Sequence, residues 1–129
     1  MLKKRRLSAL QRQKPNFILG AQGESRAVSF LVSLQYQILD RNVRVGNHEI
    51  DLIGRDGQTG ELVFVEVKTR TSEQFGSPSS AVTRKKIKSL QAVAEQYLKT
   101  NKLFENFRYD IIAVLPGSIE HYQNITWNY

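Results

Sequence analysis

The chain of 129 residues carries a formal net charge of +7 and has no cysteine. This length fits one domain with a buried core, and the lack of cysteine excludes a disulfide framework, a thiolate zinc site and a cysteine nucleophile. No apolar run reaches the ~18 residues of a membrane-spanning helix, and cysteine-free composition fits a reducing compartment. We therefore expect a cytoplasmic protein without a membrane partner.

The positive charge is concentrated at the start of the chain. Six basic side chains precede the first acidic one, whereas the remainder is almost neutral; they are Lys3, Lys4, Arg5, Arg6, Arg12 and Lys14. We predict a basic arm over residues 1–16 and a single domain over residues 17–129. Such arms bind polyanions, although a solubilising tail has the same composition.

The first predicted element is a helix over residues 24–35, with Gly20 and Gly23 at its entry. Its apolar residues recur at spacings of three and four and form one stripe, made of Ala27, Val28, Leu31 and Leu34. Glu24 lies on the same stripe. A carboxylate there is either a functional group aimed inward or compensation for the helix dipole in a first turn.

Three strands are predicted next, over residues 36–45, 48–55 and 61–69. The turn DGQTG joins the last two into an antiparallel hairpin. A second helix follows over residues 83–99, with an apolar face made of Ile87, Leu90, Ala94, Tyr97 and Leu98. Strands over residues 107–115 and 119–127 complete a mixed α/β domain with the order helix, three strands, helix, two strands.

The third strand carries the most informative pattern. Both of its faces begin apolar, which indicates a central strand, yet Glu66 and Lys68 follow on one face. Folding the hairpin about Gln58 and Thr59 places Asp51 opposite Glu66 and Glu49 opposite Lys68, with Cβ atoms about 5 Å apart. Paired carboxylates repel unless a cation lies between them, and Mg²⁺ takes oxygen ligands.

This metal hypothesis depends on the register, because a slip by one residue would place Asp51 opposite a valine. The alternative is an ordinary solvated ion pair between Glu66 and Lys68. Further basic residues begin the second helix, namely Arg84, Lys85, Lys86 and Lys88. They would bind phosphate at a helix N-terminus or form a solvated face.

Other polar and aromatic residues carry weaker signals. His48 and His121 lack metal-type spacing, so neither is expected to be a ligand. The aromatic residues Phe104, Phe107, Tyr109 and Trp127 are expected in the core rather than as platforms for stacked bases.

Asp51 followed by Glu66-Val67-Lys68, with Glu24 on a preceding helix, resembles the PD-(D/E)XK nuclease signature. More specifically, the chain resembles the bacterial YraN family over residues 20–127. The matching segments are Gly23-Glu24 with Ala27, EIDLI from Glu49, FVEVKTR from Phe64, FGSPSSAV from Phe75, Lys86, AEQYL from Ala94 and RYDII from Arg108. His48 stands where a glycine is usual in the family, Tyr109 replaces a commoner phenylalanine, and Ile50 replaces the proline of the signature.

The resemblance implies a restriction-endonuclease-like α/β core that uses Mg²⁺ or Mn²⁺ to hydrolyse DNA. Asp51, Glu66, the Val67 carbonyl and Glu24 would hold the metal, Lys68 would act in catalysis, and Glu49 would support them. The basic arm (Lys3, Lys4, Arg5 and Arg6) and Arg84 to Lys88 would contact phosphates. Similarity to Holliday-junction resolvases suggests branched or otherwise structured DNA, and a duplex substrate would suit a homodimer.

Two other readings remain open. The same fold could bind nucleic acid or a protein partner without cleavage. The chain could also be a structural protein in which Asp51, Glu66 and Lys68 form a buried salt bridge, so that Asp51→Ala would cost roughly 3–5 kcal/mol of stability.

Overall fold

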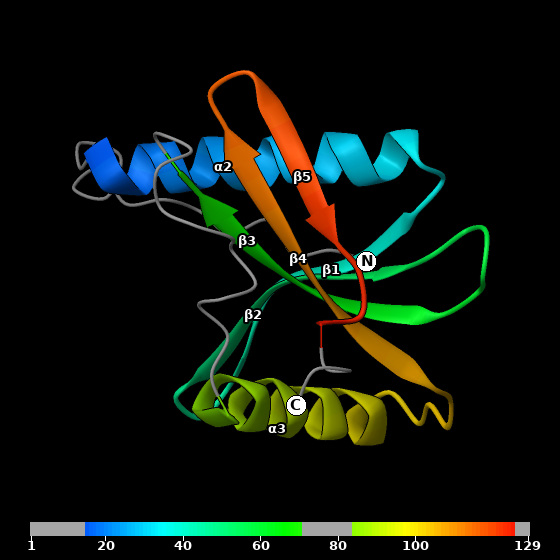
Figure 1. The fold of residues 1–129 in the computed structure, drawn as a ribbon. Coiled ribbons are helices and arrows are strands. Elements are labelled where there is room, and N and C mark those ends of the chain that lie inside the picture. Colours follow the sequence, from blue (N-terminus) through cyan, green and yellow to red (C-terminus); the bar gives the residue numbers. More distant parts are fainter. Residues whose placement is uncertain (1–14, 71–83, 126–129) are drawn as a thin grey trace.

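The computed structural model describes residues 15–70 and 84–125, and the side chains from residue 22 onward. One five-stranded sheet lies between two helices, one on each face (Figure 1). The elements are α2 (Pro15–Ser33), β1 (Gln37–Val45), β2 (His48–Arg55), β3 (Leu62–Thr69), α3 (Arg84–Thr100), β4 (Phe107–Leu115) and β5 (Ser118–Tyr122). The predicted mixed α/β class and the order of elements are confirmed.

The strands follow one another across the sheet in the order β1-β2-β3-β4-β5. Neighbours are antiparallel except β3 and β4, which are parallel and are connected through α3. One hydrophobic cluster packs Phe64 and Tyr109 beneath α3, and a second packs Val63 and Val65 beneath α2. As predicted, β3 is a central strand covered on both faces.

Helix α2 begins at Pro15, nine residues before the predicted start at Glu24. Proline is compatible with a first helical turn because the missing N–H has no partner there. The predicted boundary of the arm at residue 16 therefore falls just inside the helix, while residues 1–14 lie outside the described part of the chain. Gly20 and Gly23 lie within α2 instead of marking its entry.

The C-terminal end of α2 also differs from the prediction. The helix ends at Ser33, and Gln35 adopts a φ of 70° as the chain turns into β1. Ala27 and Leu31 are buried as expected, but Leu34 is exposed because it lies in this turn. The apolar stripe is therefore one residue shorter than predicted.

The hairpin of β2 and β3 is confirmed, and the side chain of Asp56 organises its turn. Asp56 Oδ1 accepts hydrogen bonds from the backbone N–H groups of Gln58 (2.8 Å) and Thr59 (3.4 Å). Gly60 supplies a φ of 77° that L side chains rarely adopt, and its N–H donates to the Asp56 carbonyl.

The register of this hairpin follows the prediction from Arg55↔Leu62 to Leu52↔Val65. Beyond that pair the two strands separate, because β2 stays paired with β1 and β3 stays paired with β4 (Figure 1). Asp51 and Glu66 are therefore not a directly opposed pair, and neither are Glu49 and Lys68. We refer to this opening between β2 and β3 as the strand fork.

Divergence of β2 also changes one predicted face. Ile50 belongs to the cluster of Ile53 beneath α3, whereas Leu52 belongs to the cluster beneath α2. Strict alternation along a strand would place Ile50 and Leu52 on the same face. The first part of β2 lies beside α3 (Figure 1), and Ile50 packs in the cluster on that side.

The remaining expectations concern the C-terminal half. Helix α3 buries Ile87, Leu90 and Ala94 as predicted, together with Val93. Strand β5 ends at Tyr122, five residues earlier than predicted. Phe107 and Tyr109 belong to the core, but Phe104 is 97% exposed in the loop before β4, and Trp127 lies outside the described residues.

Candidate functional site

Asp51 lies at the strand fork, where β2 leaves β3. Its Oδ2 accepts a hydrogen bond from the backbone N–H of Val67 at 2.8 Å. Val67 lies beyond Leu52↔Val65, the last backbone pair of β2 and β3. Its N–H is therefore bonded by the side chain of Asp51 instead of by a backbone carbonyl of β2. This contact fixes the carboxylate beside the end of β3.

Several carboxylates surround Asp51. The pKa of Asp51 is raised to about 6. Burial is the main cause, and the negative charges of Glu24, Glu66 and Glu49 add to it, whereas the hydrogen bond from the Val67 N–H opposes it. The predicted acidic residues are thus brought into electrostatic contact without strict cross-strand pairing. Such a group favours a bound proton or cation.

Glu66 is the most deeply placed of these carboxylates, with only 10% of its side chain exposed. Its Oε1 lies 2.6 Å from Lys86 Nζ and 3.3 Å from Lys68 Nζ. Its Oε2 is buried and accepts no hydrogen bond from the residues that the structure describes. A buried oxygen of this kind is costly unless something binds it.

Glu24 reaches the strand fork from α2. It lies in the third turn of the helix, not the first, so compensation of the helix dipole no longer explains it. Gly23 permits the close approach of α2 to β3, because a Cβ at this position would lie 2.2 Å from Thr69 Oγ1. Gly23 therefore serves the packing of α2 on β3, while the adjacent Glu24 is a candidate functional residue.

The oxygen atoms at the strand fork are compatible with a hard cation that takes only a few of its ligands from the protein. Carboxylate and carbonyl oxygens suit Mg²⁺ or Mn²⁺, and Mg²⁺ often keeps several waters and uses one or two carboxylates. Within the described residues, no three His, Asp or Glu side chains are already grouped as a complete metal cluster. The unpartnered Oε2 of Glu66 and the raised pKa of Asp51 are the observations that fit a cation here.

Asp51 is not joined to Lys68 in the ion pairs that the described residues form. Its hydrogen bond comes from the backbone N–H of Val67 instead. Only the Glu66–Lys68 part of the predicted bridge is present.

The basic cluster of α3 divides into two parts. Arg84, Lys85 and Lys88 are exposed, while Lys86 reaches Glu66. Sequence reasoning placed Lys86 among phosphate contacts and missed its position beside the carboxylates. The arm residues Lys3, Lys4, Arg5 and Arg6, and the segment FGSPSSAV, lie outside the described residues.

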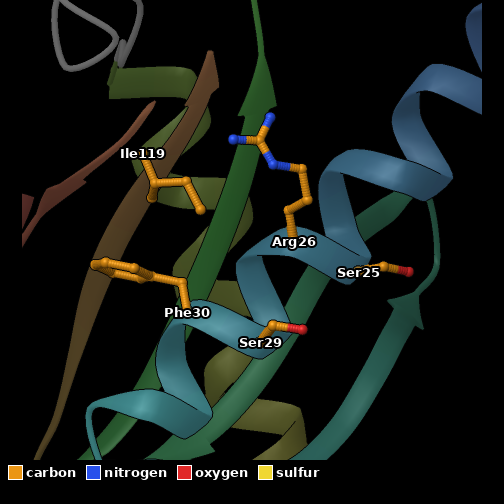
Figure 2. Close-up of a pocket in the computed structure, with 5 residues that line it drawn as sticks. All are labelled: Ser25, Arg26, Ser29, Phe30 and Ile119. Carbon is orange, nitrogen blue, oxygen red and sulfur yellow. The ribbon is translucent and has the colours of Figure 1, made fainter. Parts of the chain in front are cut away.

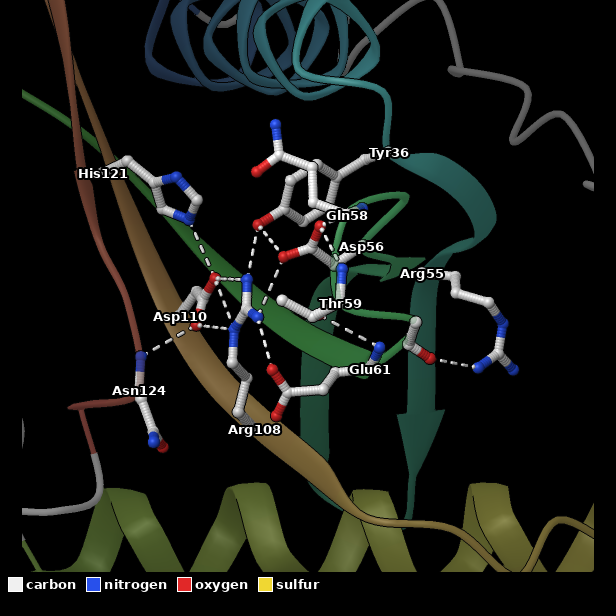
Figure 3. A network of polar contacts seen from close by, with 11 residues as sticks. Tyr36, Arg55, Asp56, Gln58, Thr59, Glu61, Arg108, Asp110, His121 and Asn124 are labelled. Atoms are coloured by element: carbon white, nitrogen blue, oxygen red, sulfur yellow. Dashed lines mark hydrogen bonds and ion pairs between the residues drawn. The ribbon is translucent and has the colours of Figure 1, made fainter.

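A second polar cluster was not predicted. Arg108 is 5% exposed at the centre of a buried network that joins β4 to the hairpin turn and to the start of β1 (Figure 3). Its Nη1 donates to Asp56 (3.0 Å) and Glu61 (2.9 Å), its Nε donates to Asp110 (3.1 Å), and its Nη2 donates to the Tyr36 hydroxyl. The signal in the sequence was a pair of charges, Arg108 and Asp110, on one face of an apolar strand.

Charge neutralisation stabilises this network. Burial alone would raise the pKa of Asp56, but hydrogen bonds from the Gln58 N–H and from Arg108 outweigh it and hold the pKa below its usual value. Asp110 also contacts His121 Nε2 at 2.8 Å and accepts the backbone N–H of Asn124 at 2.9 Å. The cluster is internally satisfied, which indicates a structural role.

A surface pocket of about 480 Å³ lies elsewhere, between α2 and the β4–β5 hairpin (Figure 2). It is lined by Ser25, Arg26, Ser29, Phe30 and Ile119. Arg26 Nη1 is already engaged by the Leu115 carbonyl at 2.8 Å. The candidate carboxylates are not among these lining residues.

Comparison with known proteins identifies the family. Residues 23–114 match the model of the Uncharacterised protein family UPF0102, and the chain belongs to this family, as the YraN resemblance predicted. A UPF0102 protein of Chlorobaculum parvum is 46% identical over 103 residues, covering 79% of this chain and 78% of that protein. One from Geobacter sulfurreducens is 42% identical over 115 residues, covering 84% and 88%.

A solved structure titled "Crystal structure of SSO0001" is also similar. It is 21% identical with a TM-score of 0.46, and the match covers 89% of this chain but 54% of that one. Separately, no helix in the described ranges is long and apolar enough to cross a membrane.

Proposed function

We propose that this protein is a Mg²⁺- or Mn²⁺-dependent endonuclease that hydrolyses phosphodiester bonds of DNA. The observation that carries the proposal is the strand fork, where a buried Glu66 oxygen without a partner lies in the same electrostatic cluster as Asp51, with Lys68 adjoining. The order of elements and the resemblance to the PD-(D/E)XK signature support the same reading.

The residues of the fork have distinct roles in this mechanism. Asp51 and Glu66 would hold the metal together with the Val67 carbonyl, and Glu24 would complete the site. Bound metal would polarise the scissile phosphate and lower the pKa of a water nucleophile. The Lys68 ammonium would orient that water and would stabilise the negative charge that develops on the phosphate. Glu49 supports the arrangement through its charge near Asp51.

Substrate would approach over the N-terminal end of α3. Its exposed cations, Arg84, Lys85 and Lys88, supply salt-dependent phosphate contacts. The first turn of α3 contains no acidic residue that would repel a phosphate. Structured DNA such as a four-way junction belongs in the substrate panel, and a homodimer would place two sites on a symmetric duplex.

The test is cleavage of plasmid, linear duplex, single-stranded and four-way-junction DNA with Mg²⁺, Mn²⁺ or EDTA. We expect metal-dependent cleavage of at least one substrate by the wild type. Asp51→Asn should abolish cleavage, and Lys68→Met should slow it roughly 100- to 1,000-fold, the usual cost of losing one preorganised donor.

Controls separate cleavage from binding and from contamination. Glu95→Gln, an exposed change on α3, should leave the rate unaltered, and activity that persists in Asp51→Asn would identify a contaminating nuclease. If no substrate is cut and Mn²⁺ leaves the melting temperature unmoved, the endonuclease proposal is wrong. The alternative, a non-catalytic nucleic-acid or protein-binding module, predicts that Lys85→Gln weakens binding while Asp51→Asn does not matter.

A further inference from the structure

Lys86 lies in the carboxylate cluster although it comes from the basic segment of α3. Its Nζ is 2.6 Å from Glu66 Oε1, closer than the 3.3 Å of Lys68 Nζ. Its side chain is 36% exposed, whereas that of Glu66 is 10% exposed. Lys86 is therefore a partly exposed cation at the solvent side of a nearly buried anion.

The two lysines reach Glu66 by different routes. Lys68 is two residues from Glu66 on the same face of β3, so the backbone holds it close to the carboxylate. Lys86 extends across from another element, and rotation of its long side chain can carry the ammonium away without moving the sheet. Of these two cations, Lys86 is the one whose ammonium can leave Glu66 while the sheet stays in place.

A metal at the strand fork would conflict with docked Lys86. Lys86 contacts Oε1 of Glu66, whereas Oε2 is the oxygen that would be open to an ion. The two oxygens belong to one carboxylate, so an ion held there would lie close to the ammonium. Coulomb repulsion between the two cations is strong at such a distance in a partly buried site. The same repulsion acts on Lys68, but more weakly, because its ammonium lies 3.3 Å from Glu66 Oε1 instead of 2.6 Å. Lys86 is therefore the cation that a bound divalent ion disfavours most.

Resting on the proposed function, we infer that Lys86 is a built-in competitor of the metal: it neutralises Glu66 in the metal-free protein and leaves when the divalent ion binds. Released from Glu66, its ammonium becomes available beside the exposed Arg84, Lys85 and Lys88. The same side chain is then a counterion in one state and a potential phosphate contact in the other. Lys86 is a positioning residue for the metal, not a catalytic one.

The test measures Mn²⁺ affinity by calorimetric titration, without DNA, for the wild type, Lys86→Gln and Lys85→Gln. Lys85→Gln is the matched control, because it removes the same charge from the residue directly before Lys86 in α3, and the side chain of Lys85 is exposed. We expect Lys86→Gln to bind Mn²⁺ at least about fivefold more tightly than the wild type, and Lys85→Gln to stay within about twofold. Lys86→Arg retains the charge and should keep the weaker affinity of the wild type.

Each outcome decides a different question. Equal or weaker Mn²⁺ binding by Lys86→Gln would overturn the competition while leaving the metal site intact. Equal tightening in Lys85→Gln would reduce the effect to general charge and also overturn it. If Mn²⁺ binds neither the wild type nor Lys86→Gln, the metal site and the proposed function both fail. Should Lys86→Gln not fold, tightening in Lys86→Arg would contradict the inference by itself.

Discussion

Asp51 opposes folding when it is ionised. Folding raises its pKa from the ordinary 3.8 to about 6, so the folded protein binds this proton more tightly than the unfolded chain. Stability gained from the bound proton is complete below about pH 4 and is lost as the pH rises through 6. A metal-free protein at pH 8 therefore carries an electrostatic cost at the strand fork.

We predict that Asp51→Asn stabilises the metal-free protein at pH 8 and has little effect at pH 4. Asparagine removes the charge and retains an oxygen that can accept the Val67 N–H. The gain at pH 8 should be on the order of 2–3 kcal/mol, given about 1.4 kcal/mol for each unit of pKa. Urea unfolding across this pH range measures it, with Glu95→Gln as an exposed carboxyl control. An equal difference between Asp51→Asn and wild type at both pH values would contradict the prediction.

Individual site residues were predictable to different degrees. Glu66, Lys68 and Asp51 stood out because charges in otherwise apolar strands are unusual. The contact of Lys86 with Glu66 was not predictable, since it depends on how α3 is placed against the sheet. The strand fork was also invisible, because a local pattern gives the register of a hairpin but not the point where its strands separate.

At the scale of elements, the alternation of apolar residues predicted nearly all strands and α3 within two residues. The start of α2 was missed because two glycines there suggest a break in the helix, and their packing reason lies in another element. Gly23 is opposed by Thr69 at the end of β3. Helix propensity thus disfavours glycine locally while tertiary packing requires it.

This conflict gives a prediction whose sign depends on the background. In the wild type we expect Gly23→Ala to destabilise by roughly 1–2 kcal/mol through overpacking against Thr69. In a Thr69→Ala background, which removes the oxygen that clashes, the same change should stabilise by up to about 1 kcal/mol through helix propensity. A double-mutant cycle by urea unfolding measures this; the same effect in both backgrounds would refute the contact.

At the scale of the molecule, the Arg108 network joins elements that are distant in the chain. Tyr36 comes from the entry to β1, Asp56 and Glu61 from the hairpin turn, and Asp110 from β4 (Figure 3). Loss of Arg108 would leave buried carboxylates without their cation. Removing one partner from a buried ionic network destabilises a protein by more than the intact network stabilises it, because the remaining charges are left buried and uncompensated.

We predict that Arg108→Met destabilises the protein by roughly 3–5 kcal/mol. The control is Arg55→Met, because Arg55 also forms a close ion pair, 2.6 Å from Glu105, but with about 30% of both side chains exposed. That change should cost less than about 1 kcal/mol. Thermal or urea unfolding compares the two, and similar losses would show that burial of the network matters less than we argue.

The hairpin of β2 and β3 is fastened at its turn by this network and opens at its other end. From Asp56 to Asp51 is five residues, or roughly 16 Å of strand. If β2 turned as a rigid strand, a rotation of about 4° at the turn would displace Asp51 by about 1 Å; its pairing with β1 and β3 resists such a rotation. Metal–ligand distances tolerate only about 0.2 Å. In the proposed metal site, the rigidity of the Arg108 end would therefore contribute to the precision of the carboxylate end, and substitutions in the turn would disturb ion binding before they unfold the protein.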